Sequence, residues 1–217
     1  MFQFLTVFVD VALFKKIILG AFGLPLGLFM TVVTGGELFT GNTALVTAAY
    51  MDGEIKALDL VKNWTASYLG NIVGALVLAC LAHRSQTLCG NPAAIAIATA
   101  KCMLPWGVAF IRGILCIWLV ATAIYMASGC NTLEGKMTSI WFLVSGFVAI
   151  GLDQSIANMF IIPFGMLCGA DITVQQMLTK NIIPVTLGNA VGGAICVMAP
   201  FGLTFGRWGK RLYRPRR

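Results

Sequence analysis

The sequence predicts an all-α membrane protein built from two related halves, each with one transmembrane helix that is interrupted near its centre. Two observations support this prediction. Hydrophobic residues make up 59% of the 217 residues and charged residues only 11%, whereas a soluble domain carries about 25% charged residues. In addition, one polar pattern occurs twice, about half the chain apart. The composition excludes a soluble domain, and the repeat indicates a duplicated unit.

The repeated pattern has two parts. In the first part an acidic residue precedes an asparagine by five positions, as in Glu37 and Asn42 and, 116 residues later, Asp153 and Asn158. In the second part an asparagine precedes a Gly-Asn pair by seven positions, and the two copies are 118 residues apart, with Asn63 and Asn71 in one and Asn181 and Asn189 in the other. Transporters with duplicated halves bind their substrates where interrupted helices meet near the bilayer midplane. The repeat therefore predicts a substrate site at the two interruptions.

Apolar stretches predict the transmembrane spans in order. A span needs about 20 apolar residues, and such stretches cover 17–50, 64–82, 104–127, 138–168 and 182–205. The first and fourth are too long and too polar at their centres for a simple helix, which predicts two half-helices in each, with breaks at 35–42 and 151–155. Non-helical backbone is tolerated in a bilayer only where it is packed in protein or lines a cavity. We therefore expect both breaks to face inward.

Two shorter features complete the predicted membrane domain. Residues 88–103 are apolar but too short to cross, which favours a re-entrant or interfacial helix. Glycines lie one helical turn apart in both halves, at Gly70 and Gly74 and at Gly188 and Gly192. Small residues at this spacing let helix backbones approach closely, so we expect close helix contacts at both pairs.

The two ends of the chain differ from the membrane domain at 17–205. The repeat offset places the counterpart of the span at 104–127 before residue 12, so residues 1–16 are expected to be a remnant or replacement of a first transmembrane helix. Residues 206–217 form a basic tail, because six of the fifteen basic residues lie in the last eleven positions. Basic flanks mark the cytoplasmic side of a span. The sequence thus predicts an integral, multi-pass membrane protein with its carboxyl terminus in the cytoplasm.

The residues do not favour catalysis or cofactor binding. The seven cysteines show no CxxC spacing, and His83 is the single histidine. The sequence has no nucleophile–base pair, metal-ligand cluster or cofactor motif, so we expect no enzyme, no catalytic residue, no metal and no cofactor. The net charge of +7 is concentrated in the tail, which does not indicate nucleic-acid binding. The expected surroundings are a lipid bilayer.

Several motifs together resemble the formate/nitrite transporter family. They are GELFTGNT at 36–43, NWTASYLGNIVGA at 63–75, RGILCIWLVATAIYMA at 112–127, FVAIGLDQSIANMFIIPFG at 147–165 and NIIPVTLGNAVGGA at 181–194. The resemblance implies six helices per protomer in an aquaporin-like inverted repeat, of which the first is largely missing here. It also implies a homopentamer with one pore through each protomer, and small monovalent anions such as formate and nitrite as substrates.

The resemblance assigns two apolar constrictions to the substrate pathway. Leu28 and Phe39 match the constriction on the cytoplasmic side, and Leu24 and Phe147 match the one on the outer side. Leu24 stands where the family often has an aromatic residue, so the outer constriction is expected to be wider. Apolar rings impede hydrated ions and can gate a pore by dewetting.

Polar residues of the pathway are assigned in the same way. Thr40 matches a threonine that donates a hydrogen bond to the substrate, and Lys101 matches a lysine that attracts anions near the outer vestibule. The chain departs from the family at Gln154, which replaces a central histidine, and at Ile117, which replaces an asparagine. Glutamine does not titrate near physiological pH as histidine does. This departure favours either a passive, channel-like mode without proton hand-off through residue 154 or another small substrate.

The remaining polar residues of the repeat are expected to brace the breaks. A carboxylate buried in a membrane is usually paired or functional, but a bare carboxylate in the pathway would repel an anion. We therefore predict bracing rather than substrate contact for Glu37 and Asn42 in the first break and for Asp153 and Asn158 in the second. Asn71 and Asn189 are expected to support them.

Two alternatives to anion transport stay open. Asn91-Pro92-Ala93 spells the aquaporin signature, which would indicate a channel for water or small neutral solutes. It occurs once and outside the long spans, so a turn followed by a short helix is the favoured interpretation. The second alternative is a truncated assembly subunit that does not transport, because a first helix is not evident.

Overall fold

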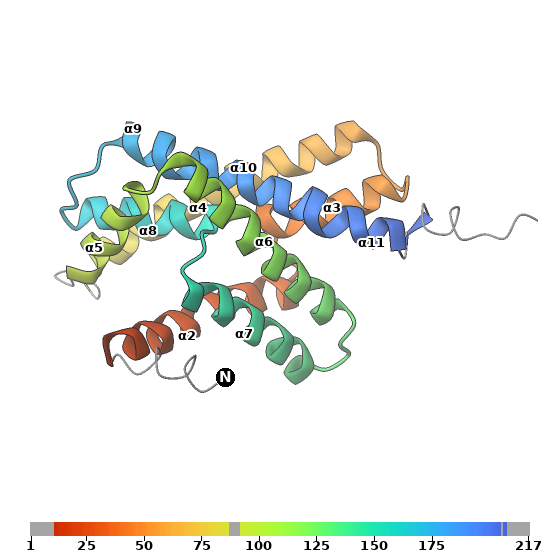
Figure 1. Ribbon diagram of the computed structural model, residues 1–217, viewed down its shortest axis with the longest axis horizontal. Helices are drawn as coiled ribbons and strands as arrows, with labels where there is room; N and C mark the ends of the chain where they lie inside the picture. Colours follow the sequence, from red (N-terminus) through yellow and green to blue (C-terminus); the bar gives the residue numbers. More distant parts are fainter. Residues whose placement is uncertain (1–10, 87–91, 205, 208–217) are drawn as a thin grey trace, which may run out of the picture. The chain divides into compact units, whose positions relative to one another are not determined.

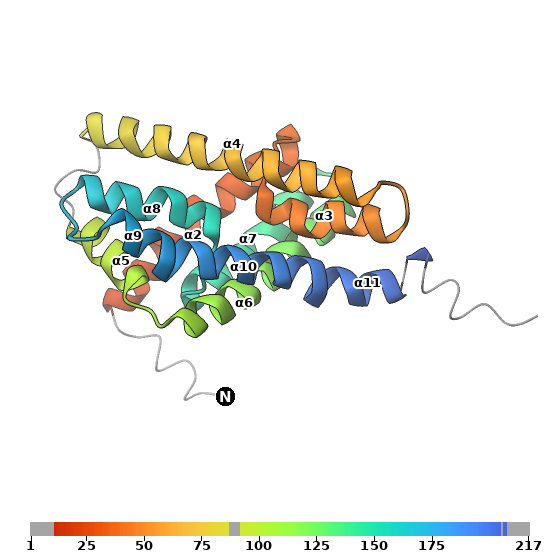
Figure 2. The same ribbon diagram turned by 90° about the horizontal axis from the view of Figure 1, so that it is seen from above.

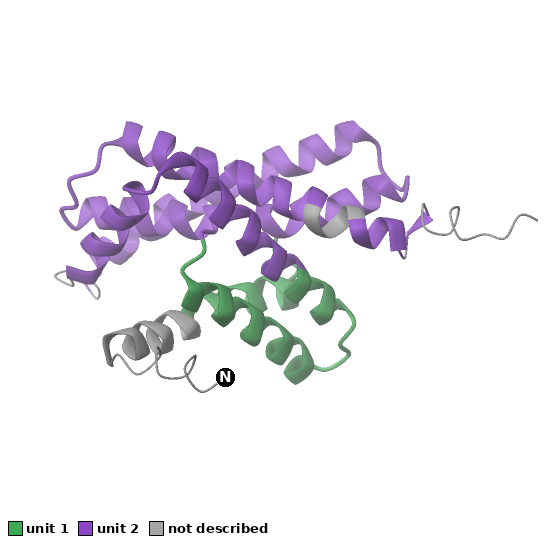
Figure 3. Ribbon diagram, viewed as in Figure 1, with its two compact units in different colours: residues 1–36, 122–152 green, residues 37–121, 153–217 purple. Residues whose placement is uncertain are grey.

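The computed structural model describes residues 11–86, 92–204 and 206–207, apart from the side chains of 11–22 and 196–199. Every regular element in these ranges is a helix (Figure 1). The chain divides into two compact units, of which unit 1 holds residues 1–36 and 122–152 and unit 2 holds residues 37–121 and 153–217 (Figure 3). Each is described by itself.

Unit 1 is built around two helices that pack along each other, α2 (Val11–Thr34) and α7 (Leu133–Ile150). It also holds the end of α6 (Trp106–Ser128), whose first part belongs to unit 2. The side chain of Thr132 caps the start of α7 by accepting a hydrogen bond from the backbone N–H of Gly135. Gly151 ends α7 in the left-handed conformation, with φ of 83°, which glycine adopts without steric cost.

Unit 2 contains the two half-helices that follow the breaks, α3 (Phe39–Met51) and α8 (Ser155–Leu167). The long helix α4 (Ala57–Arg84) packs on both of them, and α5 (Pro92–Cys102) packs on α8 (Figure 2). The last helical stretch, from Val174 to Thr204, contacts α3, α5 and α8. It consists of α9 (Val174–Gln176), π-helical η1 (Met177–Ile182), α10 (Ile183–Val191), π-helical η2 (Gly192–Met198) and α11 (Ala199–Thr204).

Length and composition agree with the five predicted spans. Within the described residues, four helical stretches are long and apolar enough to cross a membrane, or five if α2 and α3 together form one broken span. The predicted short helix at 88–103 is α5, which starts at Pro92, where proline suits a first helical turn. Its 11 residues extend about 16 Å at 1.5 Å per residue, well short of a bilayer core of about 30 Å.

Both predicted breaks are present, but the first is shorter than expected. The helix stops after Thr34 and resumes at Phe39, so Thr40 and Asn42 lie in the first turn of α3 rather than in the break. Threonine and asparagine are compatible with a helix start because their side chains can bond locally. The second break covers residues 151–154, as predicted to within one residue.

The two ends of the membrane domain are described in part. Helix α2 covers Val11–Thr34, and α11 covers Ala199–Thr204. Residues 1–10 of the expected remnant and residues 208–217 of the basic tail lie outside the described residues.

The expected close contacts at the glycine pairs occur in one half only. A Cβ added to Gly188 would lie 2.2 Å from the carbonyl oxygen of Phe110, and one added to Gly192 would lie 2.7 Å from that of Ile114. These distances show that α6 lies directly against α10 and the start of η2. At Gly70 and Gly74 no atom lies within 4 Å of an added Cβ. No other described part of this chain packs on that face of α4, so close contact at this pair stays a prediction.

Candidate functional site

The starts of α3 and α8 meet inside unit 2 through a buried hydrogen bond. Gln154 directly precedes α8, and its Nε2 donates to Oγ1 of Thr40 in the first turn of α3 over 3.1 Å. Thr40 is fully buried and Gln154 is 9% exposed. The start of a helix carries a partial positive charge, with backbone N–H groups left free of helical bonds. The two side chains of the junction are therefore neutral and shielded from solvent, and they lie where helix starts offer backbone hydrogen-bond donors.

Amide side chains hold the break before α3. Asn42 donates from Nδ2 to the Glu37 carboxylate and to Oδ1 of Asn63, the latter over 2.9 Å. Oδ1 of Asn71 accepts from the backbone N–H of Phe39 over 2.9 Å, and its Nδ2 donates to the backbone carbonyl of Glu37 over 3.0 Å. The carbonyl of Glu37 in the break and the N–H of Phe39 directly after it thus have side-chain partners. Non-helical backbone in a membrane requires such partners.

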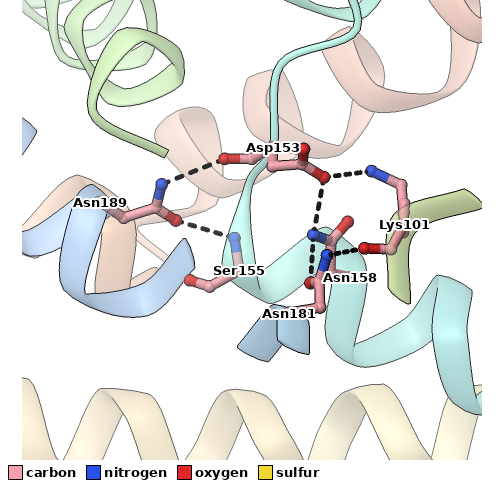
Figure 4. A network of polar contacts seen from close by, with 6 residues as sticks. All are labelled: Lys101, Asp153, Ser155, Asn158, Asn181 and Asn189. Atoms are coloured by element: carbon pink, nitrogen blue, oxygen red, sulfur yellow. Dashed lines mark hydrogen bonds and ion pairs between the residues drawn. The ribbon is translucent and has the colours of Figure 1, made fainter. Parts of the chain in front are cut away.

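The break before α8 is held by the same bonds at the repeated positions (Figure 4). Asn158 donates from Nδ2 to Oδ1 of Asp153 over 3.0 Å and to Oδ1 of Asn181 over 2.8 Å. Oδ1 of Asn189 accepts from the backbone N–H of Ser155 over 2.8 Å, and its Nδ2 donates to the carbonyl of Asp153 over 3.1 Å. The repeat in the sequence is therefore a repeat of hydrogen bonds.

Among the described residues, a cation pairs with the second of the two carboxylates and not with the first. Nζ of Lys101, near the end of α5, lies 2.6 Å from Oδ1 of Asp153, and the two side chains are 20% and 1% exposed. The backbone carbonyl of Lys101 also accepts a hydrogen bond from Asn181 over 3.0 Å (Figure 4). Glu37 is exposed, and no lysine or arginine of the described residues forms an ion pair with it. Lys101 neutralises the buried carboxylate of Asp153, whereas water can solvate the exposed carboxylate of Glu37.

Two buried polar atoms at the start of α8 have no hydrogen-bond partner among the described residues. They are Oγ of Ser155 and Oδ1 of Asn158. A buried polar atom without a partner is energetically costly. A small polar molecule next to this turn could therefore form hydrogen bonds with these two atoms.

The predicted pathway residues are distributed over both units. Leu24 and Leu28 on α2 and Phe147 on α7 belong to unit 1, while Phe39, Thr40, Lys101 and Gln154 belong to unit 2. Leu28, Phe39 and Phe147 are buried and Leu24 is half-buried. Ile117, at the position of the family asparagine, is fully buried on α6. Within unit 2 the structure brings Thr40 to Gln154 and Lys101 to Asp153.

Sequence reasoning did not assign a role to Asn63 and Asn181. Both accept a hydrogen bond from the bracing asparagine of their half. The signal was present, because both residues belong to the repeated pattern at the same spacing as the Gly-Asn pairs. The aquaporin-like triplet lies elsewhere: Asn91 is outside the described residues, and Pro92 and Ala93 begin α5 rather than either half-helix.

Comparisons with known proteins agree on one family. A model of the formate/nitrite transporter family matches residues 3–202. A probable formate transporter of Methanothermobacter thermautotrophicus is 38% identical over 208 residues, covering 88% of this chain and 75% of the relative. The formate channel FocA of Haemophilus influenzae is 36% identical over 203 residues, covering 83% of this chain and 71% of that channel.

Solved structures give the same result for the fold. An FNT family ion channel superimposes with a TM-score of 0.82 at 28% identity, covering 89% of this chain and 78% of the other. A pentameric formate channel with formate bound gives a TM-score of 0.78 at 28% identity, covering 91% of this chain and 86% of the other. The helical fold of this chain is that of these channels.

Proposed function

The chain belongs to the formate/nitrite transporter family, and on this premise we propose that it conducts small monovalent anions such as formate across a membrane. The observation that carries the proposal is the junction of α3 and α8, where Thr40 and Gln154 meet at two helix starts. Helix starts of interrupted helices that point at a site in the membrane favour an anion there. The relatives named as formate channels support formate as the first substrate to test.

The junction offers hydrogen bonds to an anion without offering it a negative charge. Oγ1 of Thr40 accepts from Gln154, so the threonine hydroxyl proton remains available to a substrate oxygen. Asp153 lies directly before Gln154 but is paired with Lys101 and Asn158. We propose that Lys101 acts chiefly by cancelling this carboxylate, which would otherwise repel the anion, and that it also attracts anions toward the pathway.

Apolar side chains are proposed to form two constrictions of the pathway. In this proposal Leu28 and Phe39 form the constriction toward the cytoplasm, and Leu24 and Phe147 form the outer one. Apolar rings strip water from a passing ion and so slow hydrated ions. The bracing residues Glu37, Asn42, Asn71, Asp153, Asn158 and Asn189 hold the two breaks and do not touch the anion.

The proposed assembly is a homopentamer with one pore in each protomer. The pentameric formate channel that superimposes on this chain supports it. Helix α4 exposes large apolar side chains such as Leu58, Val73 and Leu78, which lipid or neighbouring subunits would cover. The basic tail supports a cytoplasmic carboxyl terminus through the positive-inside rule.

Replacing Thr40 by valine tests the proposed function. Purified protein in liposomes is expected to take up formate, and Thr40→Val should lower the rate about tenfold to a hundredfold, because a hydrogen bond to a charged group contributes about 1.5–3 kcal/mol. Thr65→Val serves as the control, since Thr65 is exposed on α4 and its hydroxyl bonds to the backbone carbonyl of Val61 one turn earlier in the same helix. Uptake is measured with radiolabelled formate.

Three results, from formate uptake, osmotic swelling and a native gel, would contradict the proposal. Wild-type liposomes without uptake of any small monovalent anion would exclude anion conduction. Osmotic swelling that exceeds anion flux would favour a water or neutral-solute channel instead. A stable pentamer without either flux would favour an assembly subunit that does not transport.

A histidine at position 154 should make conduction depend on pH. Gln154 cannot titrate, whereas a histidine has an unperturbed pKa of about 6.5 and would gain positive charge as the pH falls through this range. We expect the ratio of Gln154→His to wild-type formate uptake to rise as the pH falls from about 8 to about 5.5. A ratio that stays constant over this range would show that residue 154 does not contact the anion.

A further inference from the structure

An aromatic bracket surrounds the ring of Phe39 and has no counterpart in the second half. Trp64 and Tyr68 lie four residues apart on α4 and therefore on one face of that helix. The ring of Phe39 meets both edge-on, with centroid distances of 6.0 Å to Trp64 and 4.9 Å to Tyr68. Phe39 is 5% exposed. We call Trp64 and Tyr68 the bracket.

Each ring of the bracket is fixed at its polar end. Nε1 of Trp64 donates to the backbone carbonyl of Asn42 on α3 over 3.2 Å. The hydroxyl of Tyr68 shares a hydrogen bond of 3.0 Å with Oγ1 of Thr186 on α10. The backbone N–H of Phe39 is itself held by Asn71. The Phe39 ring is thus confined by two rings that cannot turn without losing a hydrogen bond.

The three aromatic residues of this arrangement are not repeated in the second half of the sequence. At the positions 116 or 118 residues later, Phe39 corresponds to Ser155, Trp64 to Ile182 and Tyr68 to Thr186. The asparagine bonds that hold the breaks occur in both halves, so they serve the shared fold. The bracket occurs only in the first half, beside a residue that follows the break and precedes Thr40. Because the bracket occurs in one half only, it indicates a function at one end of the pathway rather than a requirement of the shared fold.

We propose that Trp64 and Tyr68 are positioning residues that fix the Phe39 ring and thereby set the size of the anion that can pass. Thr186 takes part by anchoring Tyr68 from the second half. This inference rests on the proposed function, in which Phe39 narrows the pathway. A fixed ring presents one opening, which admits formate and hinders longer carboxylates. A ring free to change rotamer would open the passage to them.

The test compares uptake of propionate and formate in liposomes. Tyr68→Phe and Thr186→Val remove the same hydrogen bond from its two ends, and each should raise the ratio of propionate to formate uptake about threefold to tenfold, as expected for one hydrogen bond. The double variant should show no further rise. Tyr50→Phe, which removes a hydroxyl from an exposed tyrosine near the end of α3, should leave the ratio unchanged. Unchanged ratios in both single variants would overturn the proposal.

A second measurement reports on the ring without transport. With 4-fluorophenylalanine at position 39, the fluorine NMR spectrum should show one narrow resonance in the parent protein and broadened or multiple resonances in Tyr68→Phe and Trp64→Phe. The same single resonance in all three would overturn the positioning role. If the parent conducts neither anion, the proposed function fails, and the fluorine spectra still decide whether the bracket fixes Phe39.

Discussion

Replacing Asp153 by alanine is expected to lower the free energy of unfolding by about 3–5 kcal/mol, the cost of breaking a buried ion pair from one side. Asp153 is 1% exposed and receives the Lys101 ammonium and the Asn158 amide. Its removal leaves the Lys101 ammonium without its carboxylate and takes one of two acceptors from the Asn158 amide at a largely buried site. The change is measured by thermal or denaturant unfolding of the purified protein in detergent, with the pentamer followed on a native gel.

The repeat supplies a matched control for Asp153. Glu37 occupies the same place in the first half, bonds to the same type of asparagine, and is exposed with no cation of the described residues paired to it. Glu37→Ala should therefore cost about 1 kcal/mol or less, in the range of an exposed polar contact. Equal losses in the two variants would mean that the Lys101 ion pair does not distinguish the halves.

Replacing Gly188 by alanine should destabilise the protein by about 3 kcal/mol or more, at or above the upper end of the usual overpacking cost. The added methyl group would lie 2.2 Å from the carbonyl oxygen of Phe110, so α6 and α10 would have to separate. The separation would also stretch the bond of 2.9 Å from Asn189 to the carbonyl of Gly113. Unfolding in detergent measures the loss.

Gly70 is the matched position in the first half. An added Cβ there meets no atom within 4 Å in this chain, and alanine is a better helix former than glycine by about 1 kcal/mol. Gly70→Ala should leave the stability of the protomer unchanged or raise it slightly. A loss as large as that of Gly188→Ala in the monomeric protein would contradict the helix arrangement described for α4.

The breaks and their bracing could be predicted from the sequence because they depend on local chemistry. An acidic residue and an asparagine five positions apart lie across one break, and the repeat shows that the pattern is structural. The pairing of Asp153 with Lys101 and of Gln154 with Thr40 could not be predicted in this way. Lys101 lies outside the repeated pattern and 52 residues from Asp153, and Thr40 is 114 residues from Gln154. Only the fold brings such residues together.

One prediction was only partly right, for an identifiable physical reason. The break before α3 was placed at 35–42 because polar residues interrupt the apolar run there. The helix resumes at Phe39, because threonine and asparagine are compatible with a helix start. The spacing of Gly70 and Gly74 is the same as that of Gly188 and Gly192, but spacing alone does not say which helix packs there.

Solid-state NMR of the protein in lipid, with carbon-13 formate and nitrogen-15 glutamine side chains, can locate the anion. The anion should lie at the starts of α3 and α8, so a through-space cross-peak is expected between formate carbon and the Gln154 amide nitrogen. The peak should disappear in Gln154→Leu and weaken in Thr40→Val. A conducting protein that shows no cross-peak to Gln154 would contradict the claim that the anion passes this junction.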